Sequence, residues 1–269
     1  MNNGLITVYS VHKAFQILDL FLEHDGPLTL GEISRLLGYP KSTVHAILST
    51  MLAHEMVWQR EDGRYGFGYR AMEYAFGIRR DWKVAGQADV FLGHIVEETG
   101  LSAALFAQAS DYFINVSFKT VNVNHNLLPD LGIRMPFHTT ASGRLFLSTF
   151  SSRKLEATLK AEEFYTRYKD SDVRRKALED ELELIRQTGF SVDFTKEDVE
   201  KCCVSVIVPN TEGNTQFAFT AIGRLEDFGM TEEDLNSSYK SIRSRDKIRQ
   251  VAEVLKNNAE QYGMAFAKE

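Results

Sequence analysis

The stretch from Lys41 to Thr50 combines short hydroxyl side chains with one ammonium and one imidazole group. Its apolar residues recur at helical spacing, and a helix that buries such a stripe exposes the opposite face. Hydroxyl, ammonium and imidazole groups on an exposed helix can bond to base edges and phosphates in a major groove. The alternative is an ordinary solvated helix in a small bundle. We expect the following residues of this helix to contact duplex DNA: Lys41, Ser42, Thr43, His45 and Ser49.

The elements around this helix are those of a helix-turn-helix. Thr29 and Glu32 have the spacing of a capping box that opens a short helix, and Gly38 ends that helix. Pro40 suits the first turn of the next helix, which we expect to run from Pro40 to about His54. An earlier helix should bury the apolar residues Val11, Ala14, Phe15, Leu18, Phe21 and Leu22.

A hairpin should follow the third helix. Asp62-Gly63 lies between two β-prone runs, 56–60 and 64–67, which is a strong hairpin pattern. Three helices and a hairpin form a winged helix-turn-helix. Arg60 and Arg64 flank the tip, where they can reach phosphate or the minor groove, although both could equally be solvated.

A second group of candidate residues begins at Pro136-Phe137-His138-Thr139-Thr140-Ala141-Ser142-Gly143-Arg144. Thr139 or Thr140 can cap a following helix, and the free N–H groups at a helix start suit a carboxylate. The structural alternative is a capped helix whose glycine allows close packing on a sheet. On a strand after Lys201, alternation places Cys203 and Ser205 on one face and Cys202 on the other, so Cys203 and Ser205 are the better candidates for a polar cavity.

The two cysteines allow three other functions. A thiol-dependent hydrolase would need a histidine beside Cys203, and a redox sensor would need an exposed thiol of low pKa. A metal site is disfavoured because adjacent strand residues diverge and no Cys-x-x-Cys or His-x-x-x-His pair is present. Buried structural thiols are the commonest alternative. We expect no catalytic residue, no cofactor and no metal.

The chain should divide into a reader of DNA and a sensor. Residues 70–100 form a helical linker and a candidate dimer seam. Beyond Gly100 we expect strands at 102–108 and 112–119, helices at 140–150, 152–161 and 172–187, strands at 203–209 and 215–223, and a terminal helix from Thr231. This order indicates an α+β fold with an antiparallel sheet.

Composition indicates a cytosolic globular protein. The chain has 269 residues, 43% of them hydrophobic, and a net charge of -6, with eight basic and eight acidic residues in the first 80. A uniformly basic nucleic-acid coat is therefore excluded, while a local DNA surface is not. No apolar run is long enough for a membrane span, and no signal peptide is visible after Met1. We expect a cytoplasmic protein without membrane partners.

Four ordered blocks of the sequence resemble the IclR family of bacterial transcription regulators. They are Pro40–His45, then Tyr65-Gly66-Phe67-Gly68, then Gly132-x-Arg134 running into Pro136–Arg144, and last Gly189-Phe190-x-x-Asp193 with Cys203 and Thr220-Ala221-Ile222-Gly223. The resemblance implies a DNA-binding domain at 1–69, a linker helix at 70–100 used in dimerisation, and a GAF-like effector domain at 101–269. It also implies a dimer, or a dimer of dimers, on operator DNA.

Together, the resemblance and the strand pattern define an expected effector site. Carried over by position, the pocket residues are Thr140, Ala141, Ser142, Asp193, Cys203, Thr220 and Ile222, to which alternation adds Ser205. Family members usually bind a small organic acid there. Three positions depart from the family: Ala46 replaces a common arginine, Ile207 a frequent proline and Ile222 a small polar residue. Ile222 favours a ligand with an apolar part, and the predicted function is a DNA-binding regulator that responds to such an acid.

Overall fold

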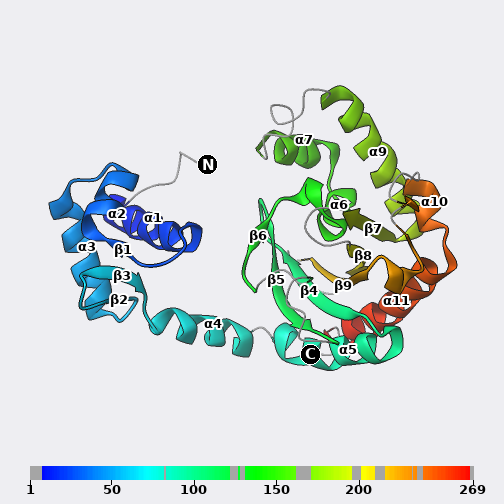
Figure 1. Cartoon of the computed structure of the whole chain (residues 1–269), viewed down its shortest axis with the longest axis horizontal. Coiled ribbons are helices and arrows are strands. Elements are labelled where there is room, and N and C mark those ends of the chain that lie inside the picture. The colour runs from blue at the N-terminus through cyan, green and yellow to red at the C-terminus, as the bar shows by residue number, and fades with distance from the viewer. Residues whose placement is uncertain are drawn as a thin grey trace. The chain divides into compact units, whose positions relative to one another are not determined.

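The polypeptide folds into two compact units, residues 1–82 and 83–269, in the computed structural model (Figure 1). The structure describes residues 8–81, 83–121, 127, 131–161, 171–195, 201–209, 216–231, 233–234 and 239–266. The division falls inside the predicted linker: 70–81 belongs to the first unit and 83–99 to the second. A separate linker domain with limits at 70 and 100 stays a prediction.

The first unit is the predicted winged helix-turn-helix. Its elements are α1 Tyr9–Glu23, β1 Leu28–Thr29, α2 Leu30–Leu37, α3 Lys41–Ala53, β2 Val57–Gln59, β3 Arg64–Phe67 and α4 Arg70–Asp81. The short strand β1, which the sequence did not reveal, pairs with β3 and completes an antiparallel sheet in the order β1-β3-β2. Ile17, Ile33, Val44 and Leu48 are fully buried at the centre of this unit.

The start of α2 and the turn before α3 follow local chemistry. The Thr29 hydroxyl accepts a hydrogen bond from the Glu32 N–H at 3.2 Å, and Glu32 Oε2 accepts one from the Thr29 N–H at 2.8 Å. This is the predicted capping box. Gly38 has φ of 70°, a left-handed conformation that glycine adopts without a Cβ clash, and it ends α2.

The predicted buried face of α1 is right in part. Phe21 is buried, and Ala14 and Leu18 pack against the core beside Ile17, as predicted for all but Ile17. Val11, Phe15 and Leu22 were also expected to be buried, but they are 50%, 60% and 68% exposed. The reason is that the apolar residues of α1 form one wide stripe, and only one side of that stripe faces the core.

The second unit contains one six-stranded antiparallel sheet in the order β6-β5-β4-β9-β8-β7. Its strands are β4 Ser102–Gln108, β5 Phe113–Lys119, β6 Arg134–Met135, β7 Phe190–Thr195, β8 Lys201–Val208 and β9 Phe217–Arg224. Its helices are α5 Lys83–Thr99, α6 Ala141–Ser148, α7 Ser152–Ala161, α9 Ser171–Thr188, α10 Tyr239–Arg243 and α11 Asp246–Phe266, with short 3-10 turns at Phe137–Thr139 and Glu226–Phe228. The two predicted strand pairs are thus parts of one sheet, because β4 pairs with β9.

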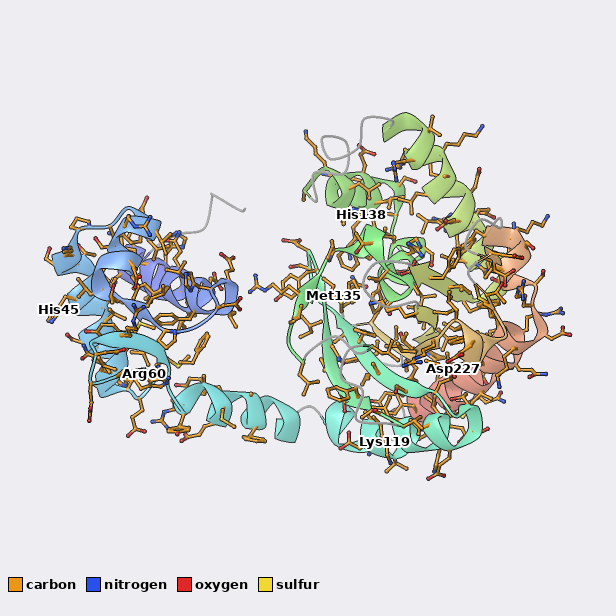
Figure 2. All side chains as sticks on the ribbon, viewed as in Figure 1. His45, Arg60, Lys119, Met135, His138 and Asp227 are labelled. Carbon is orange, nitrogen blue, oxygen red and sulfur yellow. The ribbon has the colours of Figure 1, made fainter. Side chains whose placement is uncertain are left out.

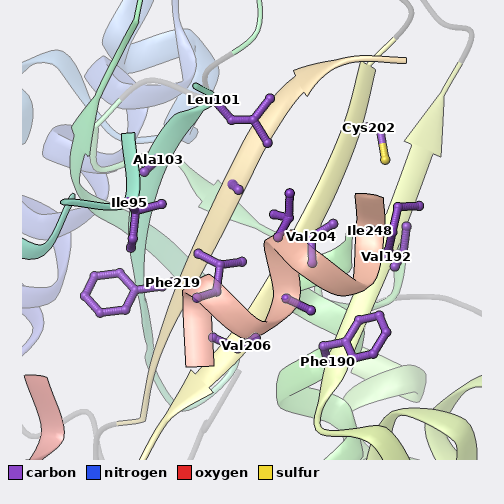
Figure 3. Close-up of a cluster of buried hydrophobic side chains, with 14 of the residues drawn as sticks. Ile95, Leu101, Ala103, Phe190, Val192, Cys202, Val204, Val206, Phe219 and Ile248 are labelled. Atoms are coloured by element: carbon purple, nitrogen blue, oxygen red, sulfur yellow. The ribbon is translucent and has the colours of Figure 1, made fainter. Parts of the chain in front are cut away.

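Helices cover both faces of this sheet. α5 and α11 pack on one face, and α6, backed by α9, packs on the other. Figure 3 shows the first face, where Cys202, Val204, Val206 and Phe219 lie beside Ile248 of α11. Cys203 packs with the cluster on the α6 side, so the two cysteines lie on opposite faces as alternation predicts.

One predicted helix start is wrong. The chain does not enter a long helix at Thr231; it forms the short α10 and then α11, which begins at Asp246. The Asp234 carboxylate does accept a hydrogen bond from the Thr231 N–H at 2.8 Å, so the capping contact forms without a continuous helix. The predicted strand-pair turn at 210–214 lies outside the described residues. No helix in the described ranges has the length and apolarity needed to cross a membrane.

The packing of α1 yields a direct test. Replacing Ile17 by alanine should destabilise the first unit by about 2–5 kcal/mol, because it empties a fully buried site. Val11→Ala, on the exposed face, should change the free energy of unfolding by less than ~0.5 kcal/mol. Denaturant unfolding followed by tryptophan fluorescence reports this unit through Trp58 of β2. Equal costs for the two variants would contradict the assigned face.

Candidate functional site

The α3 helix presents the polar face that the sequence predicts. Val44, Leu48 and Met51 are buried, whereas Lys41, Ser42, His45 and Ser49 are exposed and Thr43 is half-buried. Figure 2 shows the His45 and Arg60 side chains on this unit, from α3 and from the end of β2. The hydroxyl-bearing side of α3 is therefore free to meet a partner.

The turn before α3 is tied to both neighbouring helices. Ser34 Oγ of α2 donates to the Tyr39 carbonyl at 2.6 Å, and the Tyr39 hydroxyl donates to Gln16 Oε1 of α1. Lys13 Nζ lies over the Tyr39 ring, 4.7 Å from its centroid. These contacts fix the direction in which α3 leaves the turn.

The two wing arginines differ in what they contact. The Arg60 guanidinium lies 5.3 Å from the Trp58 ring centroid at an exposed position. Arg64 turns back: its NH1 donates to the Pro27 carbonyl at 3.1 Å and forms an ion pair with Glu32 at 3.3 Å. Hydrogen bonds from Thr29, assisted by the charge of Arg64, lower the pKa of Glu32. Arg64 thus ties the wing to α2, and its predicted contact with DNA must compete with these bonds.

The predicted effector residues come together on the α6 side of the large sheet. Register places Asp193, Cys203 and Ile222 in one row across β7, β8 and β9, and Ser205 and Thr220 in the next. Above them, Thr140 Oγ1 accepts a hydrogen bond from the Gly143 N–H at 3.1 Å and caps α6. A Cβ at Gly143 would lie 2.1 Å from the Phe137 carbonyl oxygen, so only glycine allows this approach.

Three hydroxyl groups meet beneath the start of α6. Ser142 Oγ lies 3.1 Å from Ser205 Oγ and 2.8 Å from Thr220 Oγ1, and the last two oxygens are 2.8 Å apart. All three side chains are buried. We call this set the hydroxyl triangle. Each hydroxyl can donate one bond and accept another within it, so the triangle is satisfied without a ligand.

Asp193 makes a contact that sequence reasoning missed. Its Oδ1 accepts a hydrogen bond from Arg144 NH2 at 2.7 Å, and Arg144 Nε lies 3.1 Å from Glu181 Oε2 of α9. Burial alone would lower the pKa of Arg144, but the Asp193 and Glu181 carboxylates outweigh it and raise that pKa. Burial raises the pKa of Glu181, against the effect of Arg144. The ion pairs join α6 to β7 and α9; Arg144 stood in the quoted motif, but nothing in the sequence named its partners.

A cavity of about 330 Å³ lies where β4 begins and β9 ends. Of the predicted effector residues it includes Ile222. Ser102, Arg224 and Asp227 supply polar groups, and the remaining lining residues are Gly100, Leu101, Val121, Leu127, Gly223 and Glu226. Its size is at the lower end of small-molecule pockets. Only Ile222 belongs both to the predicted effector site and to the cavity lining. The predicted site therefore has two parts, the closed hydroxyl triangle and an open cavity.

The geometry gives no support to thiol chemistry. Burial raises the pKa of Cys203 to about 12, with Asp193 adding to the shift, and burial also raises the pKa of Cys202. A thiolate nucleophile needs the opposite shift. Within the described residues no group of three or more His, Cys, Asp or Glu side chains is arranged to hold a metal ion.

Comparison with known proteins covers both units. The model of the IclR helix-turn-helix domain matches residues 10–61, and that of the bacterial transcriptional regulator IclR C-terminal domain matches residues 80–248. The chain belongs to the IclR family. It is a DNA-binding transcription regulator of the IclR type with a mixed α and β fold, as the sequence predicts.

Individual proteins of the IclR family are similar to this chain in sequence or in structure. The HTH-type transcriptional regulator XynR of Escherichia coli K12 is 28% identical over 82% of this chain and 89% of its own length. An IclR regulator structure from Silicibacter sp. TM1040 has 18% identity and a TM-score of 0.72, covering 96% of both chains. An IclR homologue from Microbacterium hydrocarbonoxydans, crystallised with 4-hydroxybenzoate, has 17% identity and a TM-score of 0.69, covering 95% of this chain and 99% of that one. The two structures support the fold.

The cysteine environment can be tested by alkylation. At pH 8, a thiol of pKa about 12 has roughly a thousandth of the thiolate present at the ordinary value of 9.0, so native Cys203 should react with iodoacetamide correspondingly slowly. Mass spectrometry would follow the labelling, with the urea-unfolded chain as control. Labelling of native Cys203 at the unfolded rate would contradict the raised pKa.

Proposed function

We propose that this chain is a cytoplasmic homodimeric regulator that binds operator DNA through α3 and responds to a small organic acid held by its second unit. The observation that carries the DNA-binding part is the exposed row of Lys41, Ser42, His45 and Ser49 on a helix whose other side is buried. Thr43 and Arg60 extend that row. Symmetry of the dimer requires two half-sites related by a two-fold axis.

The proposed ligand site is the cavity together with the hydroxyl triangle. Ile222 lines the cavity, and Thr220 lies two residues away on the same face of β9, a distance of roughly 7 Å. An acid in the cavity would place an apolar part over Ile222, Leu101 and Leu127, and turn its carboxylate toward the triangle and the capped start of α6. The 4-hydroxybenzoate bound by the Microbacterium homologue has this combination of an aromatic body and a carboxylate.

Ligand binding would act on DNA through the balance between two arrangements of the dimer. A ligand shifts that balance only by its difference in affinity for the two arrangements. A coupling free energy of about 1–3 kcal/mol would change operator affinity roughly 5–150-fold. Arg144 of α6 forms ion pairs with β7 and α9. A ligand that moves α6 would therefore also move these two elements.

The DNA contact is tested by a triple substitution. Replacing Ser42, Thr43 and His45 together by alanine should abolish retention of DNA from upstream of the protein's own gene, because the groups that read base edges are removed. Thermal unfolding should stay close to wild type, because none of the three is buried. Unchanged gel retardation by the triple variant would remove α3 from the interface.

The ligand site is tested by a thermal-shift panel of benzoate, 4-hydroxybenzoate and gluconate. An acid at 100 times its dissociation constant should add about 2.7 kcal/mol of stability to the second unit. Thr220→Val, which removes one hydroxyl of the triangle at constant shape, should reduce that gain. Thr149→Val, at an exposed position beyond α6, is the matched control. An equal gain in the Thr220 variant would place the acid elsewhere, and a flat panel would contradict the sensor.

A further inference from the structure

The wing of the first unit is poorly suited to a phosphate strand. Glu61 and Asp62 are exposed at its tip, and Arg64 is paired with Glu32. Arg60 is the one wing cation outside an ion pair among the described residues. Two carboxylates therefore face any strand that approaches the tip, and most of the affinity of proteins for duplex DNA comes from cations that neutralise phosphates.

A groove beside α3 has the opposite character. It encloses about 430 Å³ between the start of α1 and the first two turns of α3. Its lining contains one cation and no acidic residue; the lining residues are Ser10, Lys13, Ser42, Thr43, Ala46 and Ile47. Ser42 and Thr43 also belong to the proposed DNA-reading row. The groove is thus continuous with that row, and the small side chain of Ala46 leaves it open.

Lys13 is held at this groove. Its Nζ lies 4.7 Å from the centroid of the Tyr39 ring, and the Tyr39 hydroxyl is bonded to Gln16, one turn further along α1. A stacked aromatic ring orients an ammonium group without cancelling its charge. Lys13 forms no salt bridge within the part of the chain that the structure describes. The ammonium is therefore positioned and uncompensated.

Neutral donors complete the surface. Ser10 is exposed on the α1 side and Ser42 on the α3 side. Pro40 offers no side-chain cap, so the first N–H groups of α3 also lack a side-chain acceptor. A run of hydroxyl and N–H donors around one fixed ammonium matches the oxygens of a phosphodiester strand.

We propose that Lys13 and Ser10 of α1 bind the DNA phosphate backbone in this groove, beside α3, and supply the phosphate contact that the acidic wing tip does not. The proposal rests on the proposed function, because it places a strand of the same operator. Lys13 positions the duplex and does not select its sequence. Its contribution is equal on operator and on unrelated DNA.

The experiment measures DNA affinity against salt concentration for the full chain. The probes are the upstream duplex and a scrambled duplex of equal length. Lys13→Gln should lower affinity roughly five- to tenfold per half-site near 0.1 M salt, on both probes. The slope of log K against log salt should fall by about 0.9 per half-site, or about 1.8 for a dimer on two half-sites. Lys13→Arg should restore the slope.

Two further variants serve as controls, the first for folding and the second for the loss of one positive charge. Ser10→Asp puts an acidic residue in the first turn of α1, where it favours the helix, and a negative charge at the groove. It should weaken binding of both probes about tenfold without lowering the unfolding temperature. Lys256→Gln removes one cation from the second unit and should leave the salt slope unchanged.

The outcomes separate this proposal from the function on which it rests. Wild-type protein that retains neither probe, or a triple variant of Ser42, Thr43 and His45 that binds like wild type, contradicts the DNA-reading function. Normal wild-type binding with an unchanged slope in Lys13→Gln, or with unchanged affinity in Ser10→Asp, overturns the groove assignment alone.

Discussion

The three buried side chains of α3 determine where its polar side chains point. Val44, Leu48 and Met51 belong to one apolar cluster with Ile17 of α1 and Ile33 of α2, and this packing sets the rotation of the helix about its axis. Fully burying each such side chain is worth about 1.5–3 kcal/mol. The hydroxyl, ammonium and imidazole groups are then turned outward by the same packing that holds the unit together. The packing of the core therefore also sets the direction of the proposed DNA-reading row.

The two faces of the large sheet in the second unit differ in chemistry. The face under α5 and α11 is apolar, with Val204, Val206, Phe219 and Ala221 against Leu255 and Tyr262. The face under α6 mixes apolar residues with the hydroxyl triangle and with the Arg144 ion pairs. Because side chains alternate along β8 and β9, each strand contributes to both faces. A substitution on the α6 face can therefore change the proposed ligand site while the larger apolar cluster stays intact.

Local patterns in the sequence predicted most elements of this fold. The Thr29 capping box, the Asp62-Gly63 hairpin and the bounds of α3 depend on neighbouring residues, and each forms as expected. The buried face of α1 was predictable only in part, because its apolar stripe is wider than the face that packs, and only tertiary packing decides which side is buried. The pairing of β4 with β9 joins segments more than 100 residues apart, and no local pattern reveals it.

The candidate site shows the same limit. Alternation placed Cys203 and Ser205 on one face, and the resemblance added Thr220, but neither could show that two hydroxyls would bond to Ser142 of α6. The sequence also could not show that Arg144 would form an ion pair with Asp193, or that Arg64 would form one with Glu32. These contacts depend on which side chains of distant segments come within hydrogen-bonding distance. Residue types and faces are local properties, whereas the partners of a polar group are decided by the whole fold.

The mutual bonding of Ser142, Ser205 and Thr220 sets the working range of any sensor built on it. A ligand that forms a hydrogen bond with one of these hydroxyl groups must first break a hydrogen bond of the triangle. It therefore exchanges one hydrogen bond for another and gains little net enthalpy. The affinity for the ligand must then come mainly from its apolar contacts. A receptor of this kind would bind its ligand weakly and would respond only at high ligand concentration.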